Sequence, residues 1–357
     1  FIATSRTAKG ELPPVGIGGP VHAACYRSHV RTVELLLNDP RIDPNEPDSE
    51  KATLLHISSF TGNKEIVSML LKQENININA QDNDGFTPLH TACQEGFPEI
   101  VKLLLDDERI NPIILDKENE LPIHISCYDA PLEVVKLLLS DKRVVEQINS
   151  TDVAGISPFM RACMSARSDI VGLMLQNYDV DLSLVTKKGN NALQLSCGGS
   201  AETALTVKLL LEDKRIDPNI IGPIDLSALA LACQEGYKDT MRLLLEDPRV
   251  DPTITDSEGF HVFHSASSQA DIEVFQILLE VPALKNISLG KSDSMGHTPL
   301  HQACSYGVLE STKFLLDQKV EPNPLTSNNI IPFHQACASG SLELVKFLAT
   351  RKDINIA

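Results

Sequence analysis

Tryptophan is absent from this chain of 357 residues, and all aromatic residues together make up only 4% of it. Long apolar runs are also missing, since no stretch approaches the roughly 18 residues of a membrane-spanning helix. Positive charge is scarce: 31 Lys and Arg residues face 48 Asp and Glu residues, which gives a formal net charge of −17. Such a charge repels phosphate backbones and anionic lipid headgroups. We therefore expect no nucleic-acid partner and no membrane insertion, and we favour partner proteins with basic or mixed surfaces.

The eight cysteines show how the chain is organised. Each one directly follows a small residue, Ala or Ser, in a recurring phrase. Ser59 and Ser267 fill two vacant places in the series, so that ten copies follow one another at steps of 33 to 37 residues. A period in this range is typical of a solenoid. The cysteines of the series are Cys25, Cys93, Cys127, Cys163, Cys197, Cys233, Cys304 and Cys337.

One copy, residues 84–111, has the pattern of two short helices. Thr87 suits an N-cap and Pro88 suits the position after it, because proline lacks an amide that would be unpaired there. Gly96 can take the left-handed conformation that ends a helix, and Pro98 opens a second helix with an apolar face. Helices shorter than about 12 residues are marginal in water. A single copy is therefore expected to be unstable alone, and to fold only in a stack that buries both of its faces.

The phrase GFTPLHTACQEGFPEIVKLLL, residues 85–105, resembles the ankyrin repeat, whose signature includes T-P-L-H, a small pair, a glycine and an I-V-x-L-L-L helix. Related phrases recur at residues 53–56, 121–124, 298–301 and 331–334. The resemblance implies an all-α fold with short β-hairpin loops, an ankyrin-type α-solenoid of stacked helix-turn-helix repeats. It also implies that the protein binds other proteins.

The resemblance covers about residues 19–357, where we expect an array of about ten repeats. Residues 1–18 are expected to form an irregular N-terminal segment. The final phrase DINIA matches the start of another unit, so we expect the array to be truncated at its C-terminal end and to be part of a longer protein.

The chain departs from the family pattern in three ways. The usual turn after the second helix is replaced by phrases such as NDPRIDPN, which we expect to be re-routed and solvated. The signature histidine, which in the family ties the loops together, is replaced by Met160, Gln194 and Ala230. We therefore predict a weaker seam over residues 155–235. Insertions follow Cys197 and lie at residues 144–151 and 283–295, where exposed loops tolerate them.

Five copies pair His with Cys at i, i+3, and both side chains are metal ligands. Helix layers are about 10 Å apart, however, so no site would collect four ligands. Cysteines more than about 7 Å apart between Cα atoms also form no disulfide. We expect buried, reduced thiols, hence a cytoplasmic protein, with the nucleus as the alternative. No metal, cofactor or catalytic residue is expected.

The resemblance places the binding surface on a concave face formed by loop tips and by the two positions after the small pair. Aromatic and arginine anchors usually dominate interfaces, which favours the N-terminal half. The alternative, that these are ordinary solvated residues, remains open. The residues predicted to contact a partner are Tyr26, Arg27, Phe60, Gln94, Glu95, Tyr128, Asp129, Met164, Gln234, Glu235 and Tyr306.

Two functions fit the sequence. The favoured one is a non-catalytic, monomeric scaffold that binds partner proteins on its concave face. The alternative is a regulatory ankyrin array within a larger enzyme or channel, whose activity lies outside these residues.

Overall fold

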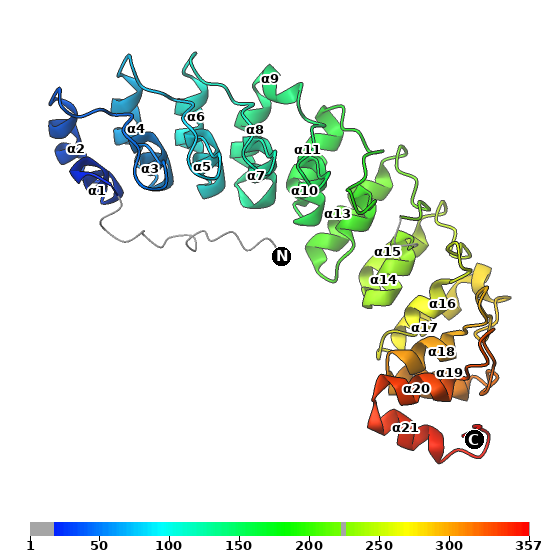
Figure 1. Cartoon of the computed structure of the whole chain (residues 1–357). Helices are drawn as coiled ribbons and strands as arrows, with labels where there is room; N and C mark the ends of the chain where they lie inside the picture. The colour runs from blue at the N-terminus through cyan, green and yellow to red at the C-terminus, as the bar shows by residue number, and fades with distance from the viewer. Residues whose placement is uncertain (1–17, 223–225, 357) are drawn as a thin grey trace. The chain divides into compact units, whose positions relative to one another are not determined.

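The computed structural model describes residues 18–222 and 226–356. Within these ranges the chain forms 21 α-helices and no β-strand (Figure 1). The predicted all-α solenoid is confirmed. The loops between repeats make tight turns without a strand ladder. The chain divides after Asp181 into two compact units, called unit 1 and unit 2 here.

Each unit contains five helix pairs. In unit 1 the first helices of the pairs are α1 (Pro20–Tyr26), α3 (Leu54–Phe60), α5 (Pro88–Glu95), α7 (Pro122–Asp129) and α10 (Pro158–Met164). The second helices are α2 (Val30–Leu37), α4 (Lys64–Leu71), α6 (Pro98–Leu105), α8 (Leu132–Leu139) and α11 (Ser168–Asn177). The insertion after α8 forms one further short helix, α9 (Lys142–Val145).

Unit 2 repeats this order. Its first helices are α12 (Ala192–Ser196), α14 (Ala228–Glu235), α16 (Val262–Ala266), α18 (Pro299–Ser305) and α20 (Pro332–Ser339). Its second helices are α13 (Ala201–Glu212), α15 (Lys238–Glu246), α17 (Glu273–Glu280), α19 (Leu309–Asp317) and α21 (Leu342–Ala349). The insertion after α17 contains a 3-10 turn, η1 (Pro282–Leu284).

The helices pack mainly against their neighbours in sequence. In unit 1, α3 contacts α1, α4 and α5, and α4 contacts α2 and α6 (Figure 1). The first helices thus form one row and the second helices another. The core lies between the rows, where Ala92 and Cys93 of α5 and Val101 and Leu104 of α6 are fully buried.

Local signals start and stop these helices. The backbone N–H of His90 donates to Oγ1 of Thr87, the N-cap of α5. Pro88 is the first residue of the helix. Gly96 ends α5 with φ +75°, in the left-handed region that favours glycine. The start and end predicted for this helix are therefore confirmed.

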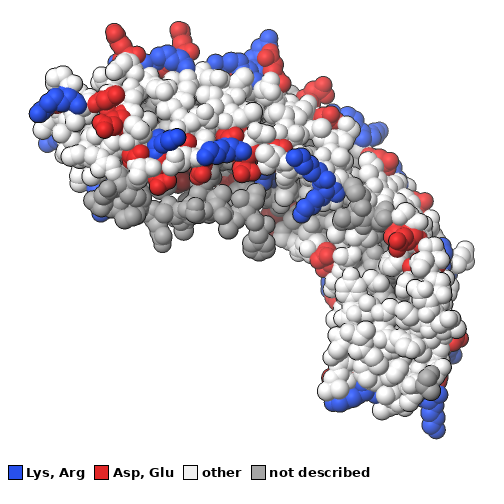
Figure 2. Space-filling view, viewed as in Figure 1, with Lys and Arg blue, Asp and Glu red and all other residues white. Residues whose placement is uncertain are grey.

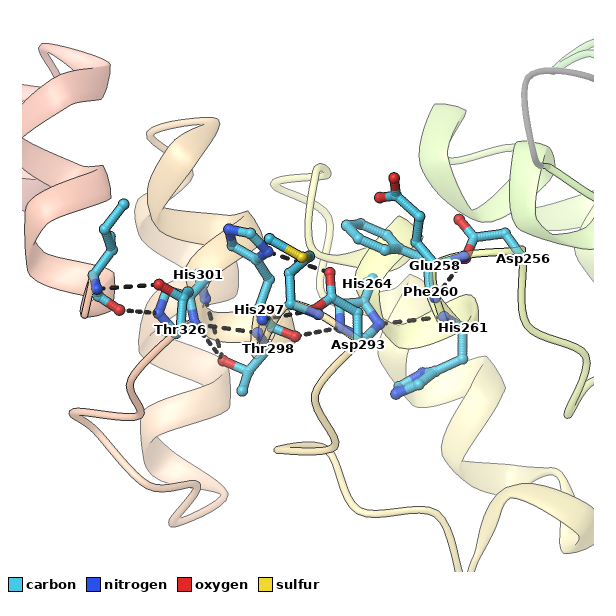
Figure 3. Close-up of polar contacts among 12 residues, drawn as sticks. Asp256, Glu258, Phe260, His261, His264, Asp293, His297, Thr298, His301 and Thr326 are labelled. Carbon is cyan, nitrogen blue, oxygen red and sulfur yellow. Dashed lines mark hydrogen bonds and ion pairs between the residues drawn. The ribbon is translucent and has the colours of Figure 1, made fainter. Parts of the chain in front are cut away.

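A row of buried histidines joins each repeat to the next loop. His56 Nδ1 accepts from the backbone N–H of Thr53, so the ring proton lies on Nε2, which donates to the carbonyl of Phe86 at 2.9 Å. Figure 3 shows the same arrangement in unit 2, where His264 bonds to the carbonyl of His297. The other bridges join His22 to Glu46, His90 to Glu120, His124 to Ser150 and His301 to Ile330.

The predicted weak seam needs correction at one of its three positions. Gln194 Oε1 accepts from the backbone N–H of Asn191, and its Nε2 donates to the carbonyl of Leu226 at 2.6 Å. A glutamine amide offers the same acceptor and donor as a neutral imidazole, so the bridge survives. Met160 and Ala230 have no side-chain donor and cannot form it.

The unusual turn after the second helix is exposed, as expected, and it also joins repeats. Asp107 holds the guanidinium of Arg109, which donates to the carbonyls of Leu71 at 2.7 Å and Gln73 at 3.0 Å, at the end of α4. Asn79 adds a second link: its Nδ2 donates to the carbonyl of Arg109 at 2.9 Å. Arg249 and Asn219 do the same in unit 2. A helix end with unpaired carbonyls favours such a cation.

Candidate protein-binding site

The residues predicted to contact a partner lie at or just after the C-terminal ends of the first helices. Tyr128 is 63% exposed, Tyr306 57% and Met164 44%. Arg27, Asp129 and Glu235 are exposed, whereas Tyr26, Phe60, Gln94, Glu95 and Gln234 are half-buried. On the face of unit 1 shown in Figure 2, acidic and basic side chains are interspersed.

Two of the residues predicted to contact a partner form hydrogen bonds within the protein. The hydroxyl of Tyr26 donates to Asp48 Oδ2 at 3.3 Å, and burial together with this carboxylate raises the pKa of the phenol. In unit 2 the carbonyl of Gln234 accepts from Ser268 Oγ at 3.0 Å and from Gln269 Nε2. Tyr26 therefore stabilises its own loop, and the backbone of Gln234 joins two repeats.

Three of the predicted residues come together in one pocket of unit 1. Tyr128 and Asp129 at the end of α7 face Met164 at the end of α10, and Arg161 and Ser165 complete the lining. The pocket volume is about 480 Å³, within the range of 300 to 1,000 Å³ found for ligand pockets. Since Tyr128, Asp129 and Met164 are exposed, the pocket opens to solvent.

Arg161 was missed because one of its partners, Glu120, lies 41 residues away in another repeat's loop. Its Nη2 donates to Glu120 Oε1 and to Asp152 Oδ2, the latter at 2.6 Å. Glu120 and Asp152 belong to two successive loops, so this guanidinium ties both loops to α10. A signal does exist in the sequence: of the ten residues that directly precede the small pair, only Arg161 is charged.

Two polar atoms in this pocket have no partner. Among the described residues, four buried side-chain atoms make no hydrogen bond, and two of them are Arg161 Nε and Ser165 Oγ. A buried donor or acceptor without a partner costs about 1 to 3 kcal/mol. Buried polar atoms without a partner are rare in native structures, and here two of them belong to residues that line the pocket.

The charges around the pocket are predominantly negative. Arg167 Nη1 donates to the carbonyl of Ala130 at 2.6 Å, and its Nη2 pairs with Asp169 at 3.0 Å. The pocket region thus carries four carboxylates, of Glu120, Asp129, Asp152 and Asp169, against the two guanidinium groups of Arg161 and Arg167.

The expectation of buried thiols is confirmed for six of the eight cysteines, whereas Cys197 is half-buried and Cys337 is exposed. Burial raises the pKa of Cys93 and Cys127 to about 12, so both thiols are protonated at neutral pH. Cys25 Sγ donates to the carbonyl of Leu54 at 3.6 Å in the next repeat. In the ranges that the structure describes, no three His, Cys, Asp or Glu side chains converge to hold a metal ion.

Comparison with known proteins identifies the fold. A family model of ankyrin repeats in three copies matches residues 74–152, 123–221, 159–256, 202–288 and 263–357, and a model of ankyrin repeats in many copies matches residues 21–71. No curated protein matches the chain. Over residues 18–222 and 226–356, no helix combines the length and apolar character required to cross a bilayer. Because the two family models together match nearly all of the sequence, the chain belongs to the ankyrin repeat family.

Proposed function

We propose that this chain is a non-catalytic scaffold that receives partner proteins on its first-helix face, with the pocket between α7 and α10 as the anchoring point. Ankyrin repeats generally mediate protein–protein interactions and are typically non-catalytic. The observation that supports this location is that Tyr128 and Met164, both well exposed, line the same pocket. Large aromatic side chains usually carry much of the binding energy at interfaces.

The test removes the two anchors together. The chain and a Tyr128→Ala, Met164→Ala variant are used as bait in cell lysate, and the captured partner is purified and titrated calorimetrically against both. Loss of a central aromatic anchor at a hot spot costs at least about 2 kcal/mol, so we expect at least a roughly 30-fold loss of affinity.

Leu342→Ala is the matched control, because Leu342 at the start of α21 is 63% exposed, as Tyr128 is, and lies outside the predicted binding residues. Its affinity should equal that of the native chain, and circular dichroism should show that all three proteins are folded. Equal affinity of the double variant and the native chain would refute the proposed location.

The proposal includes a monomer in the cytoplasm or the nucleus. All eight cysteines are free thiols, which supports a reducing compartment. Sedimentation equilibrium should give the mass of a single chain, and fractionation should place the protein with other cytoplasmic or nuclear proteins.

A further inference from the structure

We propose that the pocket between α7 and α10 takes the side chain of an arginine from an extended segment of the partner. This inference rests on the proposed function and gives the chemistry of the group that occupies the pocket.

The first argument is the charge of the pocket. The one cation that lines it, Arg161, is already held by Glu120 and Asp152 from two different loops. Its side chain is only 15% exposed, so an anionic ligand would have to displace one of these carboxylates. Asp129 also lines the pocket and is exposed at its rim. The excess of carboxylates therefore favours a cationic occupant.

The second argument is the shape and chemistry of the walls. Tyr128 presents an aromatic side chain, 63% of which is exposed, and Met164 presents a polarisable thioether beside it. A guanidinium group stacks on an aromatic ring by a cation–π contact, and its planar fork matches a carboxylate. The methylene stem of arginine can pack on an apolar side chain such as that of Met164.

The third argument is the unsatisfied lining. Ser165 Oγ can donate or accept and Arg161 Nε can only donate, so both could donate to a backbone carbonyl of the incoming segment. Both atoms are buried, so this contact requires the side chains of the lining to shift when the segment enters. A short segment that places an arginine in the pocket carries such carbonyls on both sides of the side chain. A volume of about 480 Å³ accommodates a long side chain together with part of its backbone.

The test uses a small probe and a reporter within the pocket. Met164 is one of six methionines, so protein labelled with ¹³C at the methionine methyl groups gives few signals, and a Met164→Leu variant assigns its signal. The protein is titrated at constant ionic strength with acetyl-Gly-Arg-Gly-amide, and in parallel with the Lys and Glu counterparts. We expect the arginine peptide to shift the Met164 signal with saturation, the lysine peptide to bind more weakly and the glutamate peptide to have no effect.

Two variants and a control identify the contacts. Tyr128→Ala and Asp129→Asn should each weaken the arginine peptide about two- to fivefold, as expected for one exposed cation–π contact or ion pair. Glu99→Gln removes the same charge from an exposed position at the start of α6, outside the predicted binding residues, and should leave the affinity unchanged. Equal weakening by Glu99→Gln would reduce the effect to net charge alone and would overturn the proposal.

The results also separate this inference from the proposed function. A Met164 signal that responds equally to the arginine and glutamate peptides, or to neither, overturns the arginine pocket. Equal binding of the arginine and lysine peptides overturns the preference for guanidinium. If the arginine peptide binds as expected while the double variant still captures the partner, the pocket chemistry stands and the proposed docking location falls.

Discussion

A buried histidine near the start of most first helices joins its repeat to the next loop, and burial lowers the pKa of several of these rings. Burial lowers the pKa of His124 from its ordinary 6.5 to about 4, outweighing the hydrogen bond to the carbonyl of Ser150. It also lowers the pKa values of His56, His264 and His301. In the unfolded chain these rings take up protons near pH 6.5, whereas the folded protein resists protonation until the pH is lower.

We therefore predict that the histidines make no change to the free energy of unfolding between about pH 6.5 and 8, and that it falls as the pH drops toward 4. A His124→Gln variant should retain the bridge, as Gln194 does, and should keep its stability at neutral pH. At pH 5 it should lose less stability than the native chain, by on the order of 2 kcal/mol. Urea unfolding of the native chain and the variant at about pH 7.5 and pH 5 measures these differences in stability.

His29→Gln serves as the control, since His29 is exposed and makes no bridge of this kind in the described residues. It should behave like the native chain at both pH values. If His124→Gln shows the native dependence on pH, burial of this imidazole is not what destabilises the protein in acid.

Among the elements, the turn after the second helix makes contacts that the family pattern does not provide. Arg109 caps the end of α4 through the carbonyls of Leu71 and Gln73, while Arg41 pairs only with Asp39 and its side chain is 85% exposed. Both arginines occupy the same Asp-x-Arg motif. Among the described residues, Arg109 reaches a preceding helix end and Arg41 reaches none.

Arg109→Ala should consequently lower the free energy of unfolding by about 1 to 2 kcal/mol, since it removes charge-assisted hydrogen bonds from helix carbonyls. Arg41→Ala should leave the stability unchanged, because it removes only an exposed ion pair. Denaturant unfolding of the two variants compares them directly. A similar loss for both would show that the Asp-x-Arg pair stabilises its own turn and does not join repeats.

The missing bridges should be visible in hydrogen exchange. Amides at the starts of α10 and α14 should exchange faster than those at the start of α12, because Met160 and Ala230 form no bridge and Gln194 does. Introducing the bridge by Ala230→Gln should slow exchange at α14. Uniform exchange across the three helices, in the native chain and in the variant, would contradict this assignment.

Much of the fold could be predicted from signals between neighbouring residues. Contacts between residues distant in the sequence could not be predicted. Thr87, Pro88 and Gly96 act on the backbone next to them, so the bounds of α5 could be predicted. Tyr128 and Met164 were predicted from their register within the repeat. The contact between Arg161 and Glu120 spans two loops and 41 residues, and no local pattern encodes it. Gln194 was interpreted as a lost histidine, although its amide offers the same hydrogen bonds.

For the molecule as a whole, the net charge of −17 should govern how fast partners associate. Long-range attraction to a basic segment raises the association rate and is screened within about 10 Å at 0.1 M salt. The association rate of the captured partner should therefore fall steeply between about 50 and 500 mM salt, while its dissociation rate changes less. Stopped-flow kinetics measures both rates, and an association rate independent of salt would rule out steering by this charge.

The docking location is tested most directly by hydrogen exchange of the full chain with and without its captured partner. The account predicts that residues 126–130 and 161–166, which surround the pocket, gain protection when the partner binds. Protection confined to the second helices, such as α6 and α8, with no change around Tyr128 and Met164, would contradict it.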